Sequence, residues 1–314
     1  MRISGYRGLA GIVATLVAAA LTAVGCSLAE GGEKTLRMGF VDASGQMVIP
    51  AQYVYADNFS EGLAAVRIEG KVGYIDTEGE VAIPPQFEDG GAFSEGLAPV
   101  VAMGELGYID KAGLYVIPAQ FKSGGPFSEG LAHVLVDGGY GYIDASGAFV
   151  IAPRFSRAQP FREGLAAVRS QGAWGYIDPE GAWVIPPRYD QAGPFLSGQA
   201  IVVRDDAQYV IDREGNERPV KRFDEIGPYA EGLAAARQGA LWGFVDEHGE
   251  VVIPFAYQGA RAFSEGLAPV RKGSGWGYVN TEGEVVAPFE YEQTFPFSGG
   301  RGRVLMRTTW RGDR

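Results

Sequence analysis

The fold is decided by residues 174–204, which read WGYIDPEGAWVIPPRYDQAGPFLSGQAIVVR. The segment 174–178 is rich in β-forming residues, and a glycine-containing turn at 179–181 leads to a return strand at 183–185. Two prolines then end the pairing, because proline has no backbone N–H to donate to a sheet. After a connecting loop, a third strand is expected at 200–204, turning back toward the next part of the chain. The stretch therefore predicts a three-stranded antiparallel meander of short strands.

This stretch is the fifth of eight copies that follow one another with a constant period of 34 residues. An aromatic residue recurs at this period without any insertion: Phe59, Phe93, Phe127, Phe161, Phe195, Tyr229, Phe263 and Phe297. The turn glycines keep the same register: Gly45, Gly79, Gly113, Gly147, Gly181, Gly215, Gly249 and Gly283. Helical tetratricopeptide repeats share this period, but the strand-forming and turn-forming residues of each copy favour an all-β fold.

Several copies carry a recognisable motif, WGYID at 174–178, WGFVD at 242–246 and WGYVN at 276–280, joined to FSEGLA segments. The pattern resembles the WG (also called KWG) repeat and extends over residues 36–309. The first residue of the motif departs from tryptophan at Met38, Val72, Leu106, Tyr140 and Gln208. The resemblance implies a bacterial, often surface-exposed repeat protein without a common catalytic residue, and it implies little about the ligand.

The second strand of each copy bears on how the copies are arranged. Its neighbouring residues are both apolar, as at Val116 and Ile117 or Val184 and Ile185, which we interpret as a strand covered on both faces. The first copy begins at Met38 without the polar cap that an open array needs. We therefore favour an eight-bladed propeller-like ring, with an open β-repeat array or solenoid as the alternative. No strand is expected to be exchanged between the first and last copies.

The composition excludes several classes of chemistry. The 314 residues include one cysteine and two histidines, which rules out a disulfide framework, a Cys/His zinc site and a Cys-His pair built on a second thiol. Motifs for phosphate binding and for a nucleophilic serine are also missing from the sequence. We expect no cofactor and no metal. The formal net charge of −11 opposes binding to phosphate backbones, so no nucleic-acid partner is expected.

Residues 1–25 are predicted to be a secretory signal. Arg2 and Arg7 accompany an apolar run from Leu9 to Val24, and the segment holds no acidic residue. The run is too short to span a bilayer comfortably. We therefore leave this segment out of the fold.

The residues before the single cysteine, Cys26, are small and resemble the lipobox of bacterial lipoproteins, with Ala23 in place of the usual leucine. The resemblance implies that Cys26 is acylated, that residues 26–35 form a flexible tether and that the protein is exported and anchored on the extracytoplasmic side of a bacterial membrane. The alternative is an ordinary signal peptide followed by an unmodified cysteine. Residues 310–314 are expected to be a tail.

Acidic residues recur at two positions of the repeat. One set lies three residues before the turn glycine: Asp42, Asp76, Asp110, Asp144, Asp178, Asp212, Asp246 and Asn280. We interpret these as turn-stabilising side chains, because a metal ion needs several converging oxygens and each copy supplies one. The other set precedes a glycine in the loop before the third strand and is expected to accept backbone N–H groups: Glu61, Glu95, Glu129, Glu163, Glu231 and Glu265. Neither set singles out the carboxylate pair that catalysis would require.

Function on a repeat scaffold is expected where one copy departs from the others. Three consecutive copies place an aromatic residue at one position, Tyr115, Phe149 and Trp183, where it either packs or forms a stacking platform for a sugar or peptide. The sixth copy has Glu217 at that position and Arg218 after it. These charges need partners or water, so this copy is either a binding face or a decayed repeat. All five residues are candidate ligand-binding residues.

The sequence thus predicts a non-enzymatic, monomeric, surface-anchored scaffold that binds a protein or an envelope polysaccharide or peptide. It contacts the membrane only through its lipid anchor. A glycan-active hydrolase or lyase with a carboxylate pair is the main alternative, and a purely structural spacer is a third possibility.

Overall fold

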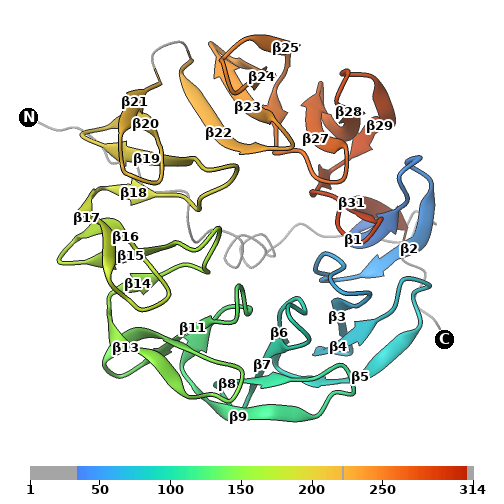
Figure 1. The fold of residues 1–314 in the computed structure, drawn as a ribbon. Helices are drawn as coiled ribbons and strands as arrows, with labels where there is room; N and C mark the ends of the chain where they lie inside the picture. The colour runs from blue at the N-terminus through green and yellow to red at the C-terminus, as the bar shows by residue number, and fades with distance from the viewer. Residues whose placement is uncertain (1–33, 221–222, 310–314) are drawn as a thin grey trace, which may run out of the picture. The chain divides into compact units, whose positions relative to one another are not determined.

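The computed structural model describes residues 34–220 and 223–309, which contain β-strands and no helix. The predicted signal segment, Cys26 and the predicted tail at 310–314 lie outside the described residues. Residues 34–308 form a ring of eight small antiparallel sheets, an eight-bladed β-propeller (Figure 1). The all-β fold and the ring are therefore confirmed. In the described part of the chain, no helical segment of the length and hydropathy that a membrane span requires is found.

The sheets are made of four strands in seven blades and of three strands in one. The first blade contains β2 (Met47–Tyr53), β1 (Lys34–Val41), β31 (Gly302–Thr309) and β30 (Gln293–Thr294), in that order. The second, third and fourth blades contain β3 (Ala64–Ile68), β4 (Lys71–Ile75) and β5 (Val81–Phe87); β6 (Asp89–Gly90), β7 (Ala98–Ala102), β8 (Glu105–Ile109) and β9 (Tyr115–Phe121); and β10 (Ser123–Gly124), β11 (Ala132–Val136), β12 (Gly139–Ile143) and β13 (Phe149–Phe155).

The other four blades follow the same order. They contain β14 (Arg157–Ala158), β15 (Ala166–Ser170), β16 (Ala173–Ile177) and β17 (Trp183–Tyr189); β18 (Gln191–Ala192), β19 (Ala200–Arg204), β20 (Ala207–Ile211) and β21 (Glu217–Pro219); β22 (Glu225–Ala230), β23 (Leu233–Gln238), β24 (Leu241–Asp246) and β25 (Val251–Tyr257); and β26 (Gly259–Ala260), β27 (Leu267–Lys272), β28 (Gly275–Asn280) and β29 (Val285–Tyr291). The last strand of each blade lies toward the outer rim of the ring (Figure 1).

A blade is not one sequence copy, and here the predicted meander within a copy was wrong. The third strand of the fifth copy, β19, pairs with β20 of the sixth copy, with Ala200 opposite Ile211 and Arg204 opposite Ala207. The two residues that join them, Asp205 and Asp206, both have left-handed φ values of 53° and 61°, as a tight two-residue hairpin turn requires. Each four-stranded blade therefore takes its first two strands from one copy and its last two from the next, and the three-stranded blade takes β3 from the first copy and β4 and β5 from the second.

This offset closes the ring. The last copy ends in β31, which has no following copy to pair with and instead lies between β30 and β1 in the first blade. Thr308 Oγ1 also donates to the Thr35 carbonyl at 3.5 Å. The expectation that no strand is exchanged across the seam was therefore wrong. The first and last copies share one sheet, which ties the two ends of the propeller together by backbone pairing.

The outer strand of each blade is covered on one face only, so our interpretation of the paired apolar residues was also wrong. Ile185 is 1% exposed, whereas its neighbour Val184 is 42% exposed. Tyr176 lies opposite Ile185 and Ile177 lies opposite Trp183, which leaves Val184 as the extra residue of a β-bulge. β17 lies on the rim of the ring (Figure 1), and its second face meets solvent at Val184, Pro186 and Arg188.

The core lies between neighbouring blades and repeats with the sequence. The Tyr176 ring packs edge-on against Phe195 with 4.9 Å between ring centroids, and its hydroxyl donates to the Gly193 carbonyl at 2.8 Å. Ile185 fills the space under the next turn, where a Cβ on Gly215 would lie 3.4 Å from the isoleucine side chain. Gly215 also has φ +81°. The turn position therefore favours glycine for two reasons, the limited space beside Ile185 and the left-handed backbone.

The recurring aspartates stabilise the hairpin turns, as predicted. One carboxylate oxygen of Asp246 accepts the backbone N–H groups of His248 and Glu250 at 2.9 and 2.8 Å. These bonds to the ionised form lower the pKa of Asp246, with the Glu250 N–H as the largest cause. Asn280 makes the same two bonds, to Glu282 and Glu284, without a charge. The position therefore requires an oxygen acceptor rather than an acid.

Candidate functional site

Three predicted site residues lie on the rim of the ring at equivalent places in consecutive blades. Tyr115, Phe149 and Trp183 begin β9, β13 and β17 and are 43%, 42% and 39% exposed. Each is followed by an exposed valine. We call these six residues the rim band: Tyr115, Val116, Phe149, Val150, Trp183 and Val184. Blades outside this arc have smaller residues at the aromatic position, such as Val81 and Val251.

The rim aromatics are held in place by the preceding blade. Trp183 meets Phe155 edge-on, with ring centroids 6.0 Å apart and an interplanar angle of 81°. Tyr115 and Phe149 meet the corresponding phenylalanines at 6.2 and 6.4 Å and at similar angles. Each ring therefore packs against the preceding blade and still exposes part of its surface. The packing interpretation and the stacking-platform interpretation are thus compatible. No ring contact connects one of these three aromatics to another in the described residues, so they form a row of separate contact points.

Glu217 ends the row, because the sixth copy places a paired charge at the aromatic position. Its Oε1 accepts from Arg204 Nη1 at 2.7 Å and from the Tyr189 hydroxyl at 3.2 Å, and Arg188 Nε lies 3.6 Å away. The half-buried carboxylate thus has three partners, contributed by β17 and β19. The sequence predicts that the charge of Glu217 needs partners or water. The partners are residues of the fifth copy.

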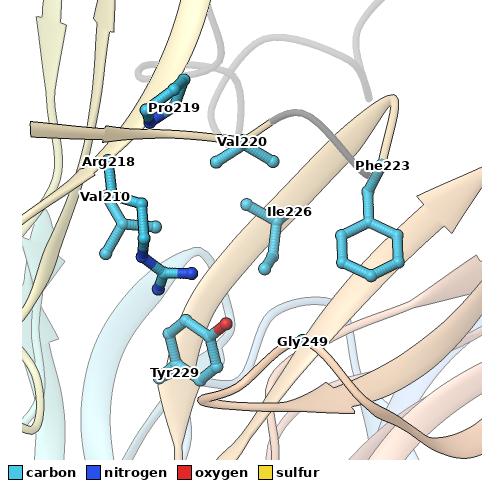
Figure 2. A pocket seen from close by; sticks show the side chains of 8 residues that line it. All are labelled: Val210, Arg218, Pro219, Val220, Phe223, Ile226, Tyr229 and Gly249. Atoms are coloured by element: carbon cyan, nitrogen blue, oxygen red, sulfur yellow. The ribbon is translucent and has the colours of Figure 1, made fainter.

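Arg218 lies apart from the rim band, at a cavity of about 170 Å³ between the sheet that ends in β21 and the sheet that begins with β22. The cavity is lined by Val210, Arg218, Pro219, Val220, Phe223, Ile226, Tyr229 and Gly249 (Figure 2). Of these residues, the sequence analysis had named only Arg218 as a candidate. Of the five candidates, the structure thus places three aromatics in one row, Glu217 at its end and Arg218 in a separate cavity.

The loop glutamates form contacts between blades. The carboxylate of each accepts a backbone N–H from the next copy, as where Glu129 Oε2 accepts from Gly164 at 2.8 Å and Glu163 Oε2 from Gly198 at 2.9 Å. The predicted acceptor role is confirmed, and the donor lies one blade away. The FSEGLA loops that carry these residues point toward the middle of the ring (Figure 1). We call these bonds the glutamate girdle. Their acceptors are Glu61, Glu95, Glu129, Glu163, Glu231 and Glu265.

The loop glutamate Glu61 does not show the environment of a general acid. Burial acts to raise the pKa of Glu61, but hydrogen bonds from Lys111 and Gly96 outweigh it, so the pKa is lowered. A proton donor for glycoside cleavage needs the opposite shift. Among the described residues, no group of three or more His, Cys, Asp or Glu side chains could hold a metal ion.

His133 lies in β11, at a position where most other copies have alanine or proline. The side chain is half-buried beside Tyr140 and Tyr142, with ring centroids 6.1 and 6.4 Å away. Burial lowers the pKa of His133 to about 4. The imidazole therefore remains neutral at physiological pH and fills space against Gly125, where an added Cβ would collide with the ring.

Comparisons with known proteins agree with this architecture. A family model described as WG containing repeat matches eight times, at residues 38–71, 73–102, 107–140, 140–172, 174–207, 210–242, 242–275 and 276–310. The search of curated proteins found no match.

Similar solved structures share the fold at low sequence identity. A eukaryotic initiation factor is 13% identical, with a TM-score of 0.54, over 84% of this chain and 87% of that one. The dihydro-heme d1 dehydrogenase NirN, solved in complex with DHE, is also 13% identical, with a TM-score of 0.51, over 87% of this chain and 73% of that one. At this identity the likeness concerns the fold alone.

Proposed function

Because the chain belongs to the family of WG containing repeats, we propose that it is a non-enzymatic binding scaffold for a protein or a cell-envelope polymer. In this proposal the acylated Cys26 holds the propeller at the extracytoplasmic side of a bacterial membrane. The observation that carries the binding role is the rim band, in which Tyr115, Phe149 and Trp183 stand exposed in three consecutive blades.

The rim band has the properties of a recognition surface. Its aromatic rings are fixed by edge-on contacts with the preceding blade, so little side-chain entropy is lost when a partner covers them. Rings with one exposed face can stack on a sugar or pack against an apolar peptide segment. The exposed valines widen the apolar surface between them, and exposed contiguous apolar surface is typical of interaction sites. The carboxylates support a non-enzymatic role, because they are used in turns and in the glutamate girdle.

We expect the triple variant Tyr115→Ser, Phe149→Ser, Trp183→Ser to lose its partner in a pull-down of solubilised envelope components. The expected loss is at least about ten-fold, since three half-exposed rings are removed together and each ten-fold step corresponds to only about 1.4 kcal/mol. The measurement is quantitative recovery of the partner by the immobilised full chain, with digestion by protease or by glycan hydrolase to assign the captured material as protein or polymer.

A matched control replaces the same strand position elsewhere in the ring: Val81→Ser, Val251→Ser, Val285→Ser. This variant removes exposed apolar residues from three other blades and should retain the partner. Equal retention by both variants, with both rings folded by circular dichroism, would count against the rim band as the binding surface.

Membrane attachment has its own test. The variant Cys26→Ser should move from the membrane fraction to the soluble fraction, because a serine hydroxyl cannot carry the lipid that the lipobox resemblance implies. Fractionation of cells followed by detection of the repeat domain measures this. Unchanged membrane recovery after washing with high salt would contradict anchoring through Cys26, and leaves the test of the rim band unaffected.

A further inference from the structure

The cavity beside Arg218 occupies space that aromatic side chains fill in the other blades. In the sixth copy, Val210 stands at the position where the other seven copies have a tyrosine or phenylalanine: Phe40, Tyr74, Tyr108, Tyr142, Tyr176, Phe244 and Tyr278. Each of those rings is fully buried and packs against an aromatic ring of the same sequence copy, in the neighbouring blade, at 4.7 to 5.0 Å. Tyr229 is the corresponding partner of Val210 and meets no such ring.

A second side chain is also missing, because the sixth copy has Pro219 where the fifth has Ile185, and this copy also lacks the β-bulge of its neighbours. In β20 and β21, Val210 lies opposite Arg218 and Tyr209 opposite Pro219, without a register shift. The equivalent of Val210 in the fifth copy lies opposite an isoleucine instead. Gly249 has no isoleucine beneath it: among the described residues, the nearest atom to an added Cβ belongs to Phe223, at 3.9 Å. The cavity is thus a missing ring and a missing isoleucine side by side.

Among the described residues that line the cavity, Arg218 is the one cation, and most of the others are apolar. Ile226 and Tyr229 are 4% and 6% exposed, and Phe223 and Val220 add further apolar surface. Figure 2 shows the Arg218 guanidinium reaching toward the Tyr229 ring, beside Ile226. Burial raises the pKa of Tyr229, and the positive charge of Arg218 acts against that rise; the Tyr229 hydroxyl donates to the Asp246 carbonyl at 3.2 Å. Among the described carboxylates, none forms an ion pair with Arg218, whereas Glu217 next to it has two arginine partners.

We propose that this cavity binds a small aromatic carboxylate, with a phenyl or phenol ring in the space that tyrosine fills elsewhere and the carboxylate at Arg218. The volume suits one ring, since a cavity of about 150 Å³ lined by apolar side chains binds benzene. The ring would meet Tyr229 as the buried tyrosines of other blades meet their phenylalanines. The guanidinium offers paired donors that match a carboxylate. This site is separate from the rim band and does not depend on the function proposed for it.

The test is a calorimetric titration of the full chain with 4-hydroxyphenylacetate, and with 4-ethylphenol as its uncharged counterpart. We expect one saturable site per chain for the acid and an affinity for the phenol that is lower by about ten-fold, the loss of one charge-assisted contact. Arg218→Gln should abolish this preference by weakening the acid alone. The control Arg271→Gln removes an exposed arginine from β27 and should change neither affinity.

A filling variant tests the cavity itself. Val210→Tyr restores the residue of the other copies and should eliminate binding of both compounds while the melting temperature stays the same or rises. If Val210→Tyr does not fold, the comparison of Arg218→Gln with Arg271→Gln still decides the proposal. Absence of saturable binding to the unmodified chain, equal affinity for acid and phenol, or unchanged binding by a folded Val210→Tyr variant would each overturn it.

Discussion

Ending the chain after Arg301 is expected to destabilise the whole propeller, because it removes β31 and leaves the first blade open. Val304 is fully buried in the cluster that contains Val41 and Phe297. Its burial contributes about 2 kcal/mol, and each lost backbone hydrogen bond about 1 kcal/mol. The total loss is therefore at least about 5 kcal/mol, which corresponds to a fall in melting temperature of at least about 10 °C for a chain of this size.

The loss extends beyond the first blade. Arg303, in β31, donates to the Ala56 carbonyl, lies 3.8 Å from a carboxylate oxygen of Asp57 and places its guanidinium 3.8 Å from the Phe295 ring centroid. One side chain therefore joins the first blade to the adjoining part of the ring. The truncation exposes the free edge of β1 as well, and an unpaired strand edge promotes association between chains.

Thermal unfolding followed by circular dichroism measures the effect, and a chain that ends after Thr309 is the matched control. That control keeps all of β31 and should melt like the complete chain. If both truncated chains melt at the same temperature as the complete protein, then the shared sheet contributes little to stability and the ring is held by contacts between blades alone.

The sequence was sufficient for the repeat and the ring but not for the pairing of strands. The period of 34 residues fixes which positions are equivalent, and the motif at 174–178 identifies the family. The sequence does not show whether β19 pairs within its own copy or with the next copy. The left-handed pair Asp205 and Asp206 decides this locally, since a two-residue turn forces adjacent strands together. The same shift of one strand accounts for the closure by β31.

The candidate site, too, could be predicted only in part from the sequence. The exposed row of Tyr115, Phe149 and Trp183 follows from comparing equivalent positions. The cavity was missed because two departures combine there. Val210 differs from the aromatic residues of the other copies and is visible in the sequence. The second departure, Pro219 in place of the isoleucine of the fifth copy, is visible as well, but the loss of the β-bulge opposite Arg218 is a property of the strand pairing. Only their coincidence leaves a space.

Removal of one whole copy is the second large effect that we expect. Deleting residues 127–160 joins Pro126 to Phe161 and connects β10 directly to the segment that leads to β15, which leaves seven complete blades. Every blade interface keeps equivalent partners: Glu95, for example, would meet Gly164 in place of Gly130. The angle between neighbouring blades, however, must grow from one eighth to one seventh of a turn. We expect a fall in melting temperature of at least about 10 °C, or loss of the cooperative transition.

This deletion distinguishes a closed ring, whose stability depends on closure, from an open array, whose stability is the sum of local contacts. An open array would lose one unit and one interface and retain the stability of the rest. In the ring, by contrast, the altered angle acts on every interface. At most of them an isoleucine side chain lies close to the Cβ position of a turn glycine, at 3.0 to 3.2 Å for Gly113, Gly147 and Gly283. The control is a circular permutant that begins at Phe127 and joins Thr309 to Lys34 through a short Gly-Ser linker. It interrupts the chain at the same point, between Pro126 and Phe127, but keeps eight blades, and should melt close to the native chain. A seven-copy chain as stable as this permutant would mean that the interfaces tolerate the wider angle, and that the number of blades is set by the length of the chain alone.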